Sequence, residues 1–327
     1  MPLLEIKQLS ISFPTDTGTA QAVDQVDLVI KKGQVLGLVG ESGCGKSVTA
    51  LSILRLVPSP GQITNGKILY EGNDLFALSE NEIRKYRGKK IALIPQDPMT
   101  SLNPVYTIGF QIIEAIQVHQ KISHKEAKQK AIELLELVRI PQGKERVDEY
   151  PHQFSGGMRQ RVMIAMALSC NPELLIADEP TTALDVTVQA QILDLLRSIQ
   201  KEKDMSILLI THDLGVVAEM CSEVAVMYAG SIVELANVQE LFRNPLHPYT
   251  VGLMNCLPKP GTSRLVPIDG QPPNLVHLPP GCRFADRCAI VEPRCRQAVP
   301  ELQEKTPGHF VRCVVVGSQT PVLTKHA

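Results

Sequence analysis

The sequence predicts an α/β fold built on a mainly parallel β-sheet. Five short apolar runs are continuous rather than alternating, which indicates strands buried on both faces, as in a parallel sheet. Segments with helical periodicity separate these runs, and a glycine-rich stretch, residues 40–47, directly follows the first run. The five runs are residues 35–39, 91–95, 174–178, 207–211 and 224–228.

Further elements are expected around this core. Residues 3–13, 23–30 and 66–70 have strand patterns, and residues 48–56 are compatible with a helix. Residues 188–199 place their apolar side chains on one helical face, which we expect to lie in the core.

Two capping boxes predict helix starts in the middle of the chain. Ser79 with Glu82, and Ser123 with Glu126, have the spacing at which a serine and a glutamate satisfy free backbone N–H groups at a helix start. The second box opens an amphipathic pattern, so a longer helix is expected there.

Composition and charge exclude some classes of protein. The 327 residues have a net charge of −1, so no basic field indicates nucleic-acid binding. The N-terminus lacks the basic and apolar segments of a secretory signal, so none is expected. No apolar run approaches the roughly 18 residues that a membrane-spanning helix needs.

The C-terminal part has a different composition. Prolines become dense after Leu257 and helical periodicity ends, so we expect a small, irregular Pro-rich and Cys-rich domain at 258–327, after a main domain at 1–257. Four of the eight cysteines lie in it, which favours a metal site over a disulfide framework. These are Cys282, Cys288, Cys295 and Cys313.

The glycine-rich stretch fits the phosphate-binding pattern G-x-x-x-x-G-K-S/T. Its backbone N–H groups are expected to point at phosphate oxygens, Lys46 to reach the β- and γ-phosphates, and Ser47 to bind Mg²⁺. Cys44 is expected to make the loop sensitive to thiol reagents. The predicted nucleotide-binding residues here are Gly40, Glu41, Ser42, Gly43, Cys44, Gly45, Lys46, Ser47 and Val48.

Two carboxylates end the apolar run 174–178. Asp178 can hold Mg²⁺ through water, and Glu179 can polarise an attacking water. Shortly before this run, Ser155, Gly156 and Gly157 open a helical segment, where backbone N–H groups and a hydroxyl make an anion site. A second phosphate site in one chain suggests that it serves another molecule.

These motifs, in this order, resemble those of ABC-transporter ATPase subunits. The matching elements are the loop 40–47, Gln96 after a strand, the signature 155–157, Asp178-Glu179, Ala183-Leu184-Asp185 and His212. The resemblance covers residues 1 to about 257. It implies a P-loop NTPase-type core with an antiparallel β subdomain and a helical signature subdomain at about 100–170. The signature departs from the common pattern at Phe154 and Met158.

The resemblance also implies roles for single residues. Gln96 would contact Mg²⁺ and the attacking water, and His212 would sense the γ-phosphate. Asp185 would align the opposite subunit, and Phe13 would stack on adenine. The implied catalytic residues are Glu179, His212, Gln96 and Lys46, and the implied Mg²⁺ ligands are Ser47, Gln96 and Asp178.

Three further stretches are similar to dipeptide and oligopeptide importers: residues 96–104, 150–153 and 247–250. Nickel importers share much of this pattern, so the cargo stays open. The resemblance implies ATP and Mg²⁺ as cofactors and a peripheral place on the cytoplasmic face of the inner membrane. The implied partners are a second, related ABC ATPase subunit, two transmembrane permease subunits and, through them, an extracytoplasmic substrate-binding protein.

The spacing of the four C-terminal cysteines fits neither common zinc ribbons nor common ferredoxins. The importer resemblance favours a 4Fe-4S iron–sulfur cluster, with zinc as the second choice and free thiols or disulfides as the third.

The sequence leaves two other functions as alternatives. A non-transport ABC ATPase acting on DNA or ribosomes is disfavoured, because the chain has one ATPase half and no sustained heptads between loop and signature. The other is a redox-sensing binding module in which the cysteine cluster is the main function.

Overall fold

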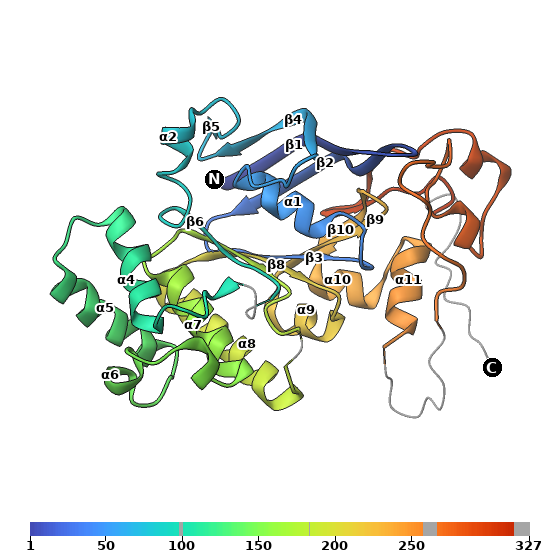
Figure 1. The fold of residues 1–327 in the computed structure, drawn as a ribbon. Coiled ribbons are helices and arrows are strands. Elements are labelled where there is room, and N and C mark those ends of the chain that lie inside the picture. Colours follow the sequence, from blue (N-terminus) through green and yellow to red (C-terminus); the bar gives the residue numbers. More distant parts are fainter. Residues whose placement is uncertain (98–100, 183, 258–266, 317–327) are drawn as a thin grey trace. The chain divides into compact units, whose positions relative to one another are not determined.

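A computed structural model describes residues 1–97, 101–182, 184–257 and 267–316. The chain divides into two compact units. The first contains Met1–Leu3, Ile30–Val35 and Asp74–Ile210, and the second contains Leu4–Val29, Leu36–Asn73 and the chain from Thr211 onward. Each unit is built from segments that lie far apart in the sequence (Figure 1).

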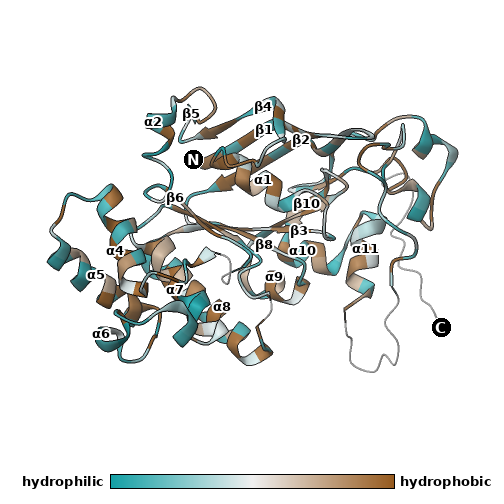
Figure 2. Cartoon of the chain, viewed as in Figure 1, coloured by the Kyte–Doolittle hydropathy of each residue, from teal (hydrophilic) through white to brown (hydrophobic). Residues whose placement is uncertain are grey.

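The first unit contains three parallel strands. They are β6 (Ile91–Ile94), β7 (Leu174–Asp178) and β8 (Ser206–Thr211). β7 lies between the other two, with Ile91 opposite Leu174 and Leu174 opposite Ser206. Their residues are almost all buried and apolar, as the mostly brown ribbons of β6 and β8 show in Figure 2. The continuous apolar runs therefore form parallel strands, as predicted.

Helices make up most of the rest of the first unit. α4 packs on α5 and α7, α5 packs on α6 and α7, and α7 also packs on β6 and α8. The capping boxes at Ser79 and Ser123 are both present, and they start α2 and α5. The helices are α2 (Glu80–Ile83), α4 (Ile108–His119), α5 (His124–Leu137), α6 (Gly143–Arg146), the 3-10 turn η1 (Pro151–Gln153), α7 (Gly156–Leu168) and α8 (Val186–Lys203).

The second unit contains an antiparallel sheet formed by the N-terminal strands. β1 (Pro2–Thr15) pairs with β4 (Gln62–Tyr70), with Leu4 opposite Tyr70, and β2 (Gly18–Lys31) lies on the other side of β1. A two-residue strand, β5 (Asn73–Asp74), follows β4. All three N-terminal strand predictions are confirmed, and the observed strands are longer than predicted.

A mixed sheet forms the rest of the second unit's β-structure. β3 (Val35–Val39) is parallel to β9 (Glu223–Tyr228), and β9 is antiparallel to β10 (Ser231–Asn237). β10 pairs with β12 (His309–Val311), which in turn pairs with β11 (Gln303–Thr306). The sequence predicted a mainly parallel sheet, whereas the observed β-structure is mixed because these late strands add antiparallel pairs.

Buried Glu234 connects the end of the chain to this sheet. It lies on β10, and its carboxylate accepts hydrogen bonds from the backbone N–H groups of Leu246 and His247 at 2.7 and 2.8 Å. His309 on β12 contacts Glu234 Oε1 through Nε2 at 2.7 Å. A buried carboxylate is tolerated because polar partners surround it.

Short helices complete the second unit. α1 (Lys46–Ile53) follows the glycine-rich loop, and α10 packs on α9, β9 and β10. The remaining elements are α9 (Leu214–Met220), α10 (Val238–Arg243), α11 (Pro248–Asn255), and the 3-10 turns η2 (Ala285–Arg287) and η3 (Pro293–Arg296). All eight cysteines are free. Within the part of the chain that the structure describes, no helix is long and apolar enough to cross a membrane.

Candidate active site

The phosphate loop joins β3 to α1 in the second unit, and two of its glycines are required by close backbone contacts. A Cβ atom on Gly40 would lie 2.1 Å from the carbonyl oxygen of Met227, and one on Gly45 would lie 2.4 Å from that of Ala22. Both glycines also have positive φ angles, of 155° and 108°. The loop can therefore curl tightly before α1 begins at Lys46.

Lys46 lies inside this curl, with only 5% of its surface exposed. Its Nζ donates to the carbonyl oxygens of Gly40 at 2.8 Å and Glu41 at 3.0 Å. Ser42 and Gly43 are exposed, and Ser47 is half-buried. The loop thus presents its middle to solvent and keeps the ammonium group beneath it.

Cys44 is buried beside Lys46, with 3% exposure. Burial raises the pKa of its thiol, and the charge of Lys46 only partly opposes that shift. A buried, protonated thiol is a poor nucleophile. We therefore expect slow reaction with thiol reagents, which reverses the expectation from the sequence.

Two predicted catalytic residues meet in the first unit. Gln96 follows β6, Glu179 follows β7, and Gln96 Nε2 donates to Glu179 Oε2 at 3.0 Å. Glu179 has a positive φ of 47°, an uncommon conformation for this residue type, and its N–H donates to Ile210 O at 2.9 Å. The strained backbone is thus fixed by β8, and it aims the carboxylate at Gln96.

Thr182 also contacts Glu179 and was not singled out in the sequence. Its Oγ1 donates to Glu179 Oε2 at 2.8 Å. Its spacing of three residues from Glu179 was the only available signal, and threonine at such a spacing is common in turns.

Asp178, the residue before Glu179, is buried, with 7% exposure, at the end of β7. Carboxylate, amide and hydroxyl oxygens are the donors that Mg²⁺ accepts, so Asp178 and Gln96 suit their predicted role.

The predicted signature lies at the N-terminus of α7. Ser155 is the N-cap, and its Oγ accepts from the N–H of Met158 at 3.3 Å. Ser155 and Gly156 are exposed, whereas a Cβ on Gly157 would lie 2.6 Å from Cγ1 of Val188 on α8. Gly157 therefore lets α8 pass close to the start of α7. The unusual Phe154 is buried in the first unit, with the Arg146 guanidinium 5.8 Å from its ring centre.

The other predicted residues occupy element ends. Asp185 is the exposed N-cap of α8 and accepts from the N–H of Val188 at 2.9 Å. His212 is exposed between β8 and α9, and Phe13 is half-buried near the end of β1, with its ring edge against Gly61. Ala183, which belongs to the same motif as Asp185, lies outside the described residues.

The segment after Gln96 presents apolar side chains to solvent. Tyr106 and Phe110 stack with ring centres 4.6 Å apart, and Val105 is 71% exposed. Gln111 holds the turn from inside, because its side chain accepts from Asn103 N at 2.9 Å and donates to Tyr106 O at 3.1 Å. Residues 98–100, part of the stretch that resembles peptide importers, lie outside the described residues.

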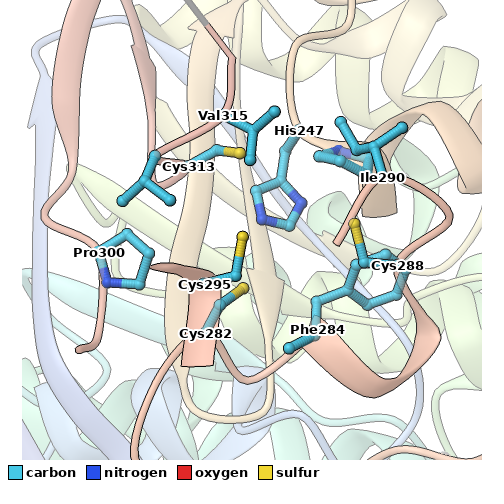
Figure 3. A pocket seen from close by; sticks show the side chains of 12 residues that line it. His247, Cys282, Phe284, Cys288, Ile290, Cys295, Pro300, Cys313 and Val315 are labelled. Atoms are coloured by element: carbon cyan, nitrogen blue, oxygen red, sulfur yellow. The ribbon is translucent and has the colours of Figure 1, made fainter. Parts of the chain in front are cut away.

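The four C-terminal cysteines line one pocket in the second unit (Figure 3). Cys282 and Cys295 are joined by a 2.7 Å backbone hydrogen bond, and the ring of His247 faces the same pocket. Burial, with smaller contributions from the neighbouring thiols, raises the pKa of Cys282 and Cys288.

This pocket does not have the geometry of a metal centre. Among the described residues, no group of three or more His, Cys, Asp or Glu side chains is arranged to hold a metal ion. The cavity measures about 10 Å³, about enough for one water molecule. The iron–sulfur prediction is therefore not supported, although the sequence correctly indicated that these four cysteines lie together.

Comparison with known proteins agrees with this arrangement. The family model described as "ABC transporter" matches residues 23–182, and the model "Oligopeptide/dipeptide transporter, C-terminal region" matches residues 233–295.

Two curated relatives cover nearly the whole chain. The oligopeptide transport ATP-binding protein OppD of Bacillus subtilis is 51% identical over 98% of this chain and 90% of its own length. The dipeptide transport ATP-binding protein DppD of the same organism is 50% identical over 95% of this chain and 94% of its own.

A solved structure shares the fold. It is the dimeric, post-hydrolysis ATP-binding cassette MJ0796 bound to ADP and Pi, 26% identical, with a TM-score of 0.65 over 72% of this chain and 98% of that chain. By its motifs, its mixed α/β fold and these relatives, the chain belongs to the ATP-binding subunits of the oligopeptide and dipeptide ABC transporters.

Proposed function

We propose that this chain lies at the cytoplasmic face of the inner membrane, where it binds and hydrolyses Mg²⁺-ATP to drive the import of dipeptides or oligopeptides. The observation that carries the proposal is the Gln96–Glu179 hydrogen bond. It places a carboxylate suited to general base catalysis beside an amide oxygen and amide N–H at the ends of two parallel strands. The names of the relatives favour peptides as cargo, and nickel or another small solute is the alternative.

In this mechanism the phosphate loop would bind the nucleotide, and Gln96 and Glu179 would act in its hydrolysis. Lys46 would exchange its bonds to loop carbonyls for bonds to phosphate oxygens, while Ser47, Gln96 and Asp178 would be the oxygen donors to Mg²⁺. Glu179 would take a proton from the attacking water. His212 would contact the γ-phosphate, and Phe13 would stack on adenine.

The exposed signature would act on a second ATPase subunit. Ser155 and Gly156 are open to solvent at a helix N-terminus, which favours an anionic ligand. A dimer with two ATP molecules between the subunits would use this site, and Asp185 would align the opposite subunit. We expect the partner to be a different but related chain.

The exposed segment around Tyr106 would dock a membrane-spanning permease subunit. Its apolar side chains form a small patch on a turn that is fixed from inside by Gln111. The alternative is an ordinary surface loop. Crosslinking from a single cysteine at Tyr106 to a co-expressed permease subunit would support docking, whereas the same cysteine at exposed Val118 serves as the control.

The four thiols that line the C-terminal pocket are the side chains that would hold a metal, although the structure does not arrange them around one. Thiolates are suitable donors for an iron–sulfur cluster, the first choice, and for zinc, the second. Either would crosslink a region with little apolar core. Anaerobic purification followed by iron, sulfide and zinc analysis decides between these metals and free thiols.

The transport function is tested in membrane vesicles that contain the whole complex. ATP on the side of the membrane that carries the ATPase should drive uptake of a labelled dipeptide. Lys46→Ala should abolish both uptake and nucleotide binding. Uptake of nickel but not of peptide would favour the alternative cargo, and ATP binding without association with membranes would contradict a transport role.

A further inference from the structure

The phosphate-loop residue Glu41 is held by a residue from the far end of the chain. Arg287 donates from Nη1 to Glu41 Oε2 at 2.8 Å and from Nη2 to Glu41 Oε1 at 3.0 Å. These two parallel bonds form a bidentate ion pair, the strongest common geometry between arginine and a carboxylate. The two residues are 246 positions apart, and both belong to the second unit.

Arg287 is fixed in place by every donor it has. Besides the pair with Glu41, its Nε donates to Asp269 O at 2.9 Å, Nη2 to Ile268 O at 3.3 Å and Nη1 to Tyr228 Oη at 3.3 Å. An arginine carries five N–H donors, and all five have an acceptor here. The side chain is 5% exposed, so little water competes for these bonds.

An aromatic cluster of Tyr228, Tyr249 and Phe284 packs around the ion pair of Arg287 and Glu41. The Arg287 guanidinium lies 5.8 Å from the ring centres of Tyr228 and Phe284. The ring of Tyr249, on α11, lies 4.6 Å from Tyr228. Its hydroxyl accepts from the backbone N–H of Glu41 at 2.8 Å. Rigid, buried rings limit the motion of both the arginine and the loop.

Every polar group of Glu41 is therefore engaged. Its carboxylate binds Arg287, its N–H binds Tyr249, and its carbonyl oxygen accepts from Lys46 Nζ. Moving Glu41 would displace the carbonyl that locates the ammonium group of Lys46. The conformation of the loop thus depends on Arg287, one residue before Cys288 of the thiol pocket.

We infer that Arg287 is a positioning residue for ATP binding, which makes the C-terminal region part of the nucleotide site. The inference rests on the proposed role of the loop as the phosphate site. Arg287 acts in two ways: it fixes the loop before the nucleotide arrives, and it neutralises a carboxylate next to the place where the phosphates bind. Pre-organisation of the loop lowers the free-energy cost of nucleotide binding, whereas an unneutralised carboxylate in the phosphate loop would raise that cost by charge repulsion.

The test measures the dissociation constant of a non-hydrolysable ATP analogue with Mg²⁺ on the full-length chain by calorimetry. Arg287→Gln should weaken binding by about tenfold, roughly the loss expected when a buried charge-assisted hydrogen bond is removed. In the membrane complex it should raise the KM for ATP more than it lowers kcat. The matched control, Arg296→Gln, breaks an exposed ion pair with Asp286 in the same region and should leave the affinity unchanged.

A double variant separates this role from general destabilisation. Arg287→Gln leaves the Glu41 carboxylate unneutralised, so adding Glu41→Gln should restore part of the lost affinity. A merely structural role predicts that the double variant binds no better than Arg287→Gln. The melting temperature, and the near-ultraviolet circular dichroism of the aromatic cluster, verify that each variant is folded.

The possible outcomes are distinct. Wild-type-like affinity of folded Arg287→Gln, or no recovery in the double variant, overturns the inference. Failure of the wild-type chain to bind the analogue would instead overturn the proposed ATPase function. If Arg287→Gln does not fold, Arg287→Lys replaces it: about threefold weaker binding is expected, because the charge stays and the bidentate geometry is lost, and unchanged binding would refute the role.

Discussion

Gln96 and Glu179 are joined by a 3.0 Å hydrogen bond between the ends of β6 and β7. The two residues are 83 positions apart, and the parallel pairing of Ile94 with Ala177 brings them together. Thr182 donates to the same carboxylate oxygen. Gln96 and Thr182 thus orient the carboxylate that is proposed to take a proton from a water molecule.

Replacing Glu179 by Gln tests its role as the base. Glu179→Gln keeps the size of the side chain and can still meet Gln96, so nucleotide binding should persist. Hydrolysis should fall by at least about a hundredfold, the usual effect of removing a general base. A phosphate-release assay and a nucleotide-binding assay on the same preparation measure both quantities.

The control is Glu173→Gln in the residue that precedes β7. Glu173 pairs with Lys90 at the opposite end of the strand, so its loss should not affect hydrolysis. ATP turnover by Glu179→Gln at the native rate would show that another group activates the water.

The close approach of α7 and α8 at Gly157 leads to a stability prediction. In Gly157→Ala the new Cβ would meet Val188 Cγ1 at 2.6 Å, a contact that forces the helices apart. Overpacking of this kind costs about 1–3 kcal/mol, and the melting temperature should fall by several degrees. Thermal unfolding monitored by circular dichroism measures the shift.

The neighbouring glycine provides a matched control. A Cβ on Gly156 would have its nearest neighbour, Leu184 Cδ2, at 3.9 Å, an ordinary contact. Gly156→Ala should therefore leave the melting temperature unchanged, and Val188→Ala should recover part of the loss in the Gly157→Ala background. Equal effects at both glycines would argue against steric contact with α8 as the cause.

Local patterns predicted much of the core and part of the site. The continuous runs became β3, β6, β7, β8 and β9, and the serine–glutamate spacing at Ser79 and Ser123 correctly marked two helix starts. These patterns are local, because a continuous apolar run and the spacing of a capping box are both read from residues a few positions apart. The order of the motifs likewise indicated Gln96 and Glu179, which the structure brings into contact.

The missed features depend on contacts between distant residues. β10 contains the buried Glu234, whose charge hides the strand pattern, and its partners His247 and His309 come from later elements. β11 and β12 have only four and three residues, too few for a periodic signal. Nothing near Arg287 in the sequence indicates that its acceptor is Glu41. The roles assigned to Phe13, Asp185 and His212 stay predictions, as does the domain boundary at residue 257.

Burial of Cys44 predicts low reactivity of the phosphate loop toward thiol reagents. Its thiol is 3% exposed and its pKa is raised by burial, so the reactive thiolate is scarce at neutral pH. Maleimide labelling followed by mass spectrometry should modify Cys44 more slowly than the half-buried Cys170. Lys46→Ala should slow the reaction further, because the charge of Lys46 lowers the thiol pKa. Labelling of Cys44 as fast as Cys170 would show that the loop opens.

The burial of Cys221 predicts how the free energy of unfolding depends on pH in the alkaline range. It is 7% exposed at the end of α9, where its Sγ lies 3.0 Å from the position that a Cβ on Gly37 of β3 would occupy. Burial raises the pKa of this thiol from 9.0 to about 12. The folded state therefore resists ionisation of Cys221, whereas the unfolded chain ionises freely above about pH 9.

The sign of the effect follows from proton binding. Between pH 9 and 12 the unfolded state binds fewer protons at this group than the folded state, so the free energy of unfolding should decrease as pH rises. The expected slope is up to about 1.4 kcal/mol per pH unit in this window, and no contribution is expected below it. Urea unfolding at a series of pH values measures the slope.

Cys221→Ala should remove this part of the slope, whereas Val217→Ala should keep it, because Val217 packs at the same place on Gly37 and has no titratable group. Equal slopes in wild type and Cys221→Ala would show that the thiol does not resist ionisation in the fold.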